Sequence, residues 1–294
     1  MPTDPRELRD DAPLLDAWLR FQESAPTPFT IPGHKQRTDL VGDVVAGDVP
    51  LYAGLDTMKL SAGVLSDAEA RAARLWGADV CRFSTGGATQ ANQAAALAVA
   101  GDGDTVVVSR TLHRSMLLGL VLAGLTPVWV RPEVDPSTGL PMGVSASGVR
   151  AALDGHPHAR AVLVGDPSYV GTVGDVAGLA AAAHDHGVPL VVDAAWAAHF
   201  GFHPDLPTNA ARLGADLVIA SMHKLGGSLG QTALIHLGHG PYADRLEPLV
   251  DRAMRSMRST SESTLLLASL DLARRQLGAR GTETIGRSLA SVQR

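Results

Sequence analysis

The sequence is short of cysteine, of long apolar runs and of excess charge of either sign. Cys81 is the only cysteine, so no disulfide can form within the chain, and a reducing compartment suits it. No apolar run reaches the roughly 18 residues that a membrane-spanning helix needs. Residues 1–4 lack the basic start and the apolar stretch of a signal peptide, and we therefore expect a cytoplasmic protein.

Net charge and composition narrow the class of protein further. A formal net charge of −5 over 294 residues gives no indication of binding to nucleic acid or to an anionic membrane. Apolar residues make up 45% of the chain and charged residues 19%, which is typical of a globular protein. The chain has no internal repeat, and it is long enough for one large domain or two modest ones. We expect no metal site.

Short β-branched runs alternate with Ala/Leu-rich stretches through most of the chain. Strands are predicted at 105–109, 127–130, 160–164, 189–193, 216–220 and 232–236. Helices are predicted at 11–21, 68–76, 94–100, 115–123, 149–153, 176–184 and 209–213. Runs such as Val106–Val108 and Leu190–Val192 are continuously apolar, which indicates strands buried on both faces. The pattern predicts an α/β fold with a mostly parallel sheet, whose ligands gather at the carboxyl ends of the strands.

Lys224 follows one of these strands within the segment Ser221-Met222-His223-Lys224-Leu225-Gly226-Gly227. A lysine held in a pocket at a strand end is desolvated, which lowers its pKa and makes its amine nucleophilic enough for a Schiff base. The alternative is a surface lysine in a turn, which is the situation of most lysines.

Asp193 ends the strongly apolar run 189–193. A carboxylate next to buried surface needs a cationic partner, and the pyridinium nitrogen of pyridoxal 5′-phosphate (PLP) is such a partner. The alternative is an ordinary helix N-cap. Lys224 lies 31 residues further along the chain, enough for one helix and one strand, so both side chains can reach the same crevice.

A glycine- and hydroxyl-rich loop, Ser84 to Gln93, precedes the Ala-rich helix predicted at 94–100. Free backbone N–H groups and the positive end of a helix dipole form a phosphate cradle. By itself such a loop is weak evidence, because many helices begin with Gly and Thr. His113 follows another predicted strand and can stack on a flat heterocycle or move protons, although its default interpretation is a partly exposed loop histidine.

Together these segments resemble the Orn/Lys/Arg decarboxylase family of fold-type-I PLP enzymes, within the aspartate aminotransferase superfamily. The resemblance runs from about Pro26 to about Gly278. It rests on ordered motifs at 27–29, 32–35, 76–79, 89, 112–115, 193–196, 199–204, 221–224, 231–232 and 268–276.

The resemblance implies a three-layer α/β/α PLP-dependent transferase fold and assigns roles by position. Lys224 would carry the Schiff base, Asp193 would bind the pyridine nitrogen, and His113 would stack on the ring. Lys224, His113 and Asp193 are the predicted catalytic residues. The predicted cofactor-binding residues, with Ala195 on the second ring face and Thr89, Ser221 and His223 at the phosphate, are Gly87, Ala88, Thr89, His113, Asp193, Ala195, Trp196, Ser221, His223 and Lys224.

The implied activity is decarboxylation of lysine, arginine or ornithine, a reaction of amino acid metabolism and polyamine biosynthesis, in a homodimer or higher homo-oligomer. Another PLP reaction on the same frame, such as transamination, aldol or lyase chemistry, stays open because fold and cofactor do not select the reaction. An inactive PLP-binding remnant stays open as well.

The chain departs from the family at three places. Ala88 replaces one of two adjacent hydroxyl residues in the phosphate loop, and the segment 55–59 has lost a histidine. The chain stops at Arg294, where the family continues into a C-terminal domain. We expect an N-terminal helix and arm at 1–45, a PLP-binding major domain at 46–277 and the start of a C-terminal region at 278–294. If that further domain is absent, self-association and little or no decarboxylase activity are expected.

Overall fold

The structure, a computed structural model, describes residues 11–24, 27, 29, 31–51, 55 and 63–292. Predictions that concern residues 1–4, 26, 28, 56–59 and 294 lie outside these residues. Seven strands form one sheet in the order β1-β9-β8-β7-β6-β2-β3. Only β9 runs against its neighbours β1 and β8, and the other pairings are parallel. The predicted mostly parallel sheet is therefore confirmed.

The sheet strands are β1 (Ala78–Ser84), β2 (Thr105–Ser109), β3 (Thr126–Val130), β6 (Val162–Gly165), β7 (Leu190–Asp193), β8 (Leu217–Ser221) and β9 (Ala233–Gly238). A separate two-stranded ribbon pairs β4 (Glu133–Val134) with β5 (Pro141–Gly143). All six predicted strands are present, shifted by at most two residues. The sequence pattern did not predict β1, because Asp79 and Arg82 interrupt its short apolar run.

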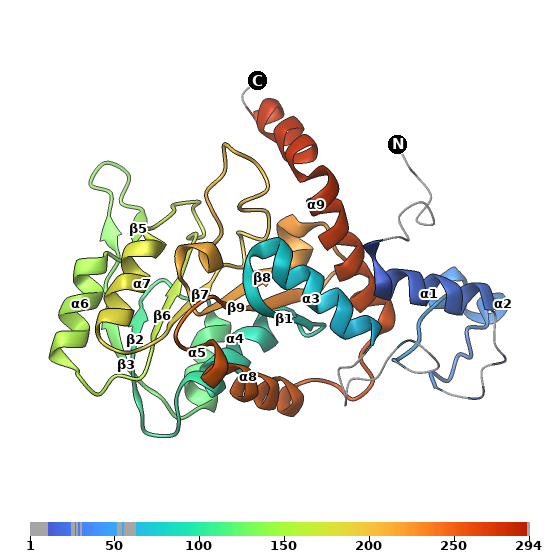
Figure 1. The fold of residues 1–294 in the computed structure, drawn as a ribbon, viewed down its shortest axis with the longest axis horizontal. Helices are drawn as coiled ribbons and strands as arrows, with labels where there is room; N and C mark the ends of the chain where they lie inside the picture. The colour runs from blue at the N-terminus through green and yellow to red at the C-terminus, as the bar shows by residue number, and fades with distance from the viewer. Residues whose placement is uncertain are drawn as a thin grey trace.

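Helices cover both faces of the sheet, which gives the three layers implied by the resemblance (Figure 1). One face carries α3 (Val64–Trp76), α6 (Ala146–Gly155), α7 (Val176–Asp185) and α9 (Thr264–Val292). The other face carries α4 (Gly87–Val99), α5 (Arg114–Leu122) and α8 (Ala243–Met257). The N-terminal helix α1 (Pro13–Ser24) packs against α3 and α9.

Shorter helical turns complete the fold: α2 (Thr38–Val41), the 3₁₀ turns η2 (Asp43–Val45) and η3 (Ala210–Leu213), and the π-helical turn η4 (Met222–Gly226). Within the described residues no helix has the length and apolarity to cross a membrane.

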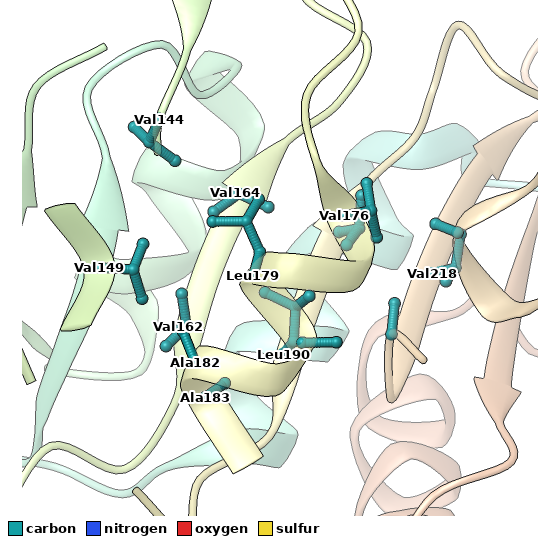
Figure 2. Packing of buried hydrophobic residues seen from close by; sticks show 14 of the residues in the cluster. Val144, Val149, Val162, Val164, Val176, Leu179, Ala182, Ala183, Leu190 and Val218 are labelled. Carbon is teal, nitrogen blue, oxygen red and sulfur yellow. The ribbon is translucent and has the colours of Figure 1, made fainter. Parts of the chain in front are cut away.

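The strands alternate their side chains between two hydrophobic cores. Leu190 and Val192 of β7 pack beneath α7 in the cluster drawn in Figure 2, while Val191 faces the opposite core, and all three are fully buried. Each such side chain contributes about 1.5–3 kcal/mol. The prediction that these strands are covered on both faces is therefore confirmed.

Three helices differ from their predictions. The helix predicted at 94–100 begins earlier, at Gly87, so the glycine loop itself forms the first turn of α4. The stretch 209–213 forms a 3₁₀ turn. Helix α8 was not predicted. Pro248 lies inside it, and its few buried apolar residues are separated by many charged ones, which makes the helical period hard to recognise. Helix α9 spans position 277, and the domain boundary predicted there stays a prediction.

Candidate active site

The connections that follow β1, β2, β6, β7 and β8 enclose a cavity of about 370 Å³ at the carboxyl end of the sheet. This is the edge at which parallel α/β sheets bind their ligands. The cavity brings together all ten residues singled out from the sequence: Gly87, Ala88, Thr89, His113, Asp193, Ala195, Trp196, Ser221, His223 and Lys224.

Lys224 lies in the η4 turn, directly after β8. Its Nζ atom is 4.1 Å from the centroid of the Trp196 ring, close enough for a cation–π contact. Burial lowers the pKa of Lys224, and the nearby charge of Asp193 opposes that shift. Because only the neutral amine is a nucleophile, a lowered pKa favours covalent chemistry at Nζ.

Asp193 is the last residue of β7, and only 6% of its surface is exposed. Its Oδ2 accepts a hydrogen bond from Asn92 Nδ2 at 2.7 Å, and its Oδ1 accepts one from the backbone N–H of Ala195 at 3.2 Å. Burial raises the pKa of this carboxyl, and the two hydrogen bonds oppose the shift. The helix-cap alternative is wrong, because turns follow Asp193 and the next helical turn begins only at Ala210.

The glycine loop forms the N-terminus of the 13-residue helix α4. Gly87 has a φ of +69°, and the N-cap Gly86 has no side chain to bond the first turn. Gln90 Oε1 accepts hydrogen bonds from Gly86 N at 3.2 Å and from Ser84 Oγ at 2.6 Å, which fixes the loop. The first-turn N–H groups, without a side-chain cap, leave a positive helix end at the cavity beside Thr89.

Ser221, at the end of β8, and His223, in η4, line the same cavity. The Oγ atom of Ser221 is buried and has no hydrogen-bond partner among the described residues. His223 Nδ1 lies 2.9 Å from the carbonyl oxygen of Thr232, and because a carbonyl only accepts, Nδ1 carries hydrogen. The Ser221 hydroxyl and His223 Nε2 are therefore both available to a ligand in the cavity.

His113 is the N-cap residue of α5 and lines the cavity half-buried. Its Nδ1 accepts from the backbone N–H of Ser115 at 3.2 Å and lies 2.7 Å from Ser115 Oγ. Its ring centroid is 6.2 Å from that of Tyr169. His113 is therefore held by Ser115 and lies beside Tyr169 at the cavity. An ordinary exposed loop histidine would not need such contacts.

The residues not singled out from the sequence include Asn92 and Tyr169, which line the cavity, and Ser115, which contacts His113. Asn92 follows Thr89 by three positions on α4 and so shares its helix face; an amide in an Ala-rich helix was the available signal. Tyr169 reaches the cavity from the turn after β6, which is closed by a hydrogen bond from Ser168 N to the carbonyl oxygen of Thr172. Nothing in its local sequence marks that position.

The unpaired groups of the cavity fit PLP. Asp193 is a buried acid that forms no ion pair among the described residues, and a pyridinium nitrogen would supply the missing charge. Among the described residues the Ser221 hydroxyl has no hydrogen-bond partner and the α4 N-terminus has no side-chain cap, and both suit a phosphate. Lys224, with its lowered pKa, suits an aldehyde.

Residues 12–293 match the family described as Orn/Lys/Arg decarboxylase, major domain. The chain belongs to this family. The chain is 34% identical to the arginine decarboxylase of Halalkalibacterium halodurans over 287 residues, and the match covers 95% of this chain and 58% of the relative. It is 33% identical to the arginine decarboxylase of Bacillus subtilis, with 93% and 57% covered. The chain therefore spans somewhat over half the length of these relatives.

Solved structures support the same placement in the family. The lysine decarboxylase A of Pseudomonas aeruginosa superposes with a TM-score of 0.80 at 25% identity, over 95% of this chain and 41% of that one. The serine palmitoyltransferase of Sphingomonas wittichii has a TM-score of 0.60 at 19% identity, over 90% of this chain and 59% of that one, and shares the fold. The family implies PLP as the cofactor.

Proposed function

We propose that this chain is the PLP-binding part of an enzyme that decarboxylates a basic amino acid: lysine, arginine or ornithine. The observation that best supports the proposal is that Lys224, Asp193 and the N-terminus of α4 line one cavity. These are the three groups needed to hold an aldehyde, a pyridine nitrogen and a phosphate.

Each group would have one role toward the cofactor. Lys224 Nζ would hold PLP covalently, with Trp196 beside it. Asp193 would bind the pyridine nitrogen. His113 and Ala195 would lie on the two faces of the ring. The phosphate would lie at the α4 N-terminus, held by the backbone of Gly87 and Ala88 and by Thr89, Ser221 and His223.

When bound, PLP supplies an electron sink that takes up the electron pair of the breaking Cα–carboxylate bond. The carboxylate of Asp193 keeps the pyridine nitrogen protonated and so keeps that sink effective. Lys224 Nζ lines the same cavity and would be one group able to deliver a proton to Cα in place of CO₂. His113 is the second group at the cavity able to deliver that proton.

The identity of the substrate rests on the relatives rather than on the cavity. Asp193 is the only acidic side chain among the described residues that line the cavity. The distal cation of lysine or arginine therefore has to find its acidic partner outside these residues. Relatives named arginine decarboxylase and lysine decarboxylase favour a basic substrate.

The test is to incubate the protein with PLP and each of lysine, arginine and ornithine, and to measure CO₂ and the matching amine. The proposal predicts both products in equal amounts from one of the three, with none from the Lys224→Ala variant. Formation of a keto acid without CO₂ would contradict decarboxylation and favour transamination.

A further inference from the structure

A continuous chain of buried hydrogen bonds joins His113 to Asp193. Asn92 Nδ2 lies 2.7 Å from Asp193 Oδ2 and 2.9 Å from Ser115 Oγ, and Ser115 Oγ lies 2.7 Å from His113 Nδ1. Asn92 is fully buried, and Ser115 is almost so. The chain thus ties together helix α4, the start of α5 and the end of β7.

The direction of each bond follows from the chemistry of its atoms. The amide nitrogen of Asn92 has two hydrogens, of which one goes to Asp193 and the other to Ser115 Oγ. The hydroxyl of Ser115 accepts from Asn92, so its own hydrogen is left for His113 Nδ1. Because the backbone N–H of Ser115 also points at Nδ1, that ring nitrogen carries no hydrogen.

The orientation of the Asn92 amide is fixed by its neighbours. If the amide were turned round, its oxygen would face the carboxylate of Asp193, and two acceptors would meet in a buried place. In the observed orientation the Oδ1 atom has no hydrogen-bond partner among the described residues. The hydrogen bond to Asp193 therefore stabilises this orientation by more than the unpaired Oδ1 of the same amide destabilises it.

We propose that Asn92 and Ser115 are positioning residues, which orient the Asp193 carboxylate and hold neutral His113 as the tautomer with its hydrogen on Nε2. His113 lines the cavity, and its Nε2–H is then a ready donor there. The orientation of the Asp193 carboxylate and the tautomer of His113 are thereby both fixed before any ligand binds. The catalytic consequence rests on the proposed function, but the chain itself belongs to the cofactor-free protein.

The test reads the ring nitrogens of His113 by ¹H–¹⁵N NMR in the cofactor-free protein, at a pH where histidine is neutral. The chain has 11 histidines, so the signal is assigned by its loss in His113→Gln. In the wild-type protein Nδ1 is expected at the position of an unprotonated nitrogen. In Ser115→Ala and in Asn92→Leu it moves toward the average of the two tautomers.

The matched control is Ser109→Ala. Ser109 is also almost fully buried, but its hydroxyl pairs with Thr111 Oγ1 at 2.8 Å rather than with His113, so its removal leaves the signal unchanged. If Asn92→Leu does not fold, Asn92→Ala removes the donor without placing a second carboxylate beside Asp193. A protonated Nδ1 in the wild-type protein, or an unmoved signal in Ser115→Ala, would overturn the proposal.

In the PLP-loaded enzyme, Asn92→Leu is expected to retain the cofactor and to lower turnover roughly 10- to 100-fold, the effect of losing a hydrogen bond to a charged group. Equal turnover of this variant and the wild-type enzyme would overturn the catalytic part of the proposal. Failure of PLP to attach to Lys224 would instead remove the proposed function and leave the NMR result intact.

Discussion

Lys224 and Asp193 have shifted pKa values, and burial is the main cause in both cases. Burial lowers the pKa of the amine and raises that of the acid, because each charged form is poorly solvated in the cavity. The charges also help each other, since the carboxylate favours the ammonium and the reverse. Binding of PLP would change this balance, because the pyridinium would become the nearest cation to Asp193.

Asp193→Asn is expected to leave PLP bound and to cut turnover roughly 100-fold, because a neutral amide cannot keep the pyridine nitrogen protonated. Spectral titration with PLP and an assay of CO₂ release measure the two effects separately. Asp216→Asn is the matched control, since Asp216 is also buried but directly precedes β8 and is not among the residues that line the cavity. Near wild-type turnover in Asp193→Asn would reduce Asp193 to a structural acceptor.

Glu69, on α3, makes stability depend on pH. Burial raises its pKa from 4.5 to about 7, although its Oε1 accepts a hydrogen bond from Phe83 N at 2.8 Å. The folded protein therefore holds this proton more tightly than the unfolded chain does. The stabilisation is fully present below about pH 4.5 and is lost as the pH rises to about 7, a loss of about 3 kcal/mol.

Glu69→Gln keeps an oxygen for Phe83 and removes the titrating proton. The variant is expected to be more stable than the wild-type protein at pH 8 and similar to it at pH 4.5, as measured by urea unfolding. A stability difference that is the same at both pH values would show that Glu69 does not titrate in this range.

At the scale of single elements, the first turn of α4 is the part of the cavity expected to bind an anion. Gly87 has a φ of +69°, and an added Cβ there would meet only the backbone of Gln231 at 3.8 Å, which is an ordinary contact. The cost of a side chain at this position is therefore conformational, about 1–2 kcal/mol. The strain would be in the backbone of residue 87, which would face the phosphate.

Gly87→Ala is expected to weaken PLP binding as well as to lower stability by about 1–2 kcal/mol. Gly103→Ala is the control, because Gly103 has a φ of +80° and open space around its Cα, but lies far from the cavity lining. Both variants should lose similar stability, and only Gly87→Ala should lose cofactor affinity. Equal PLP affinity in the two variants would contradict the cradle at the α4 N-terminus.

Regular strands and the residues at their ends were predictable, and contacts between distant segments were not. The continuous apolar run of β7 placed Asp193 at a strand end, because such a short run between helical stretches is typical of a strand buried on both faces. Asn92 and Ser115 were missed since their roles depend on two helices meeting 23 positions apart. Tyr169 was missed because only the closed turn after β6 brings it to the cavity.

The whole molecule leaves an apolar helix face exposed. On α5, Leu118, Val121 and Leu122 are 52%, 76% and 59% exposed. Contiguous exposed apolar surface favours association, and we propose that this face takes part in a homodimer. Light scattering after size exclusion should then give twice the 30.6 kDa chain mass.

Val121→Glu is expected to shift this dimer toward monomer, because burying a charge at an interface is unfavourable. Val44→Glu, at a similarly exposed valine in η2, serves as the control and should keep the wild-type mass. A monomeric wild-type protein, or an unchanged mass in Val121→Glu, would contradict the proposed interface.

The most direct test of the central claim is borohydride reduction of the protein loaded with PLP, followed by peptide mapping. The chain has three lysines, Lys35, Lys59 and Lys224, so the position of the label is decisive. The account predicts a single pyridoxyl label on Lys224, and loss of that label and of the visible absorbance of the bound cofactor in Lys224→Ala. A label on Lys35 or Lys59, or none on Lys224, would contradict it.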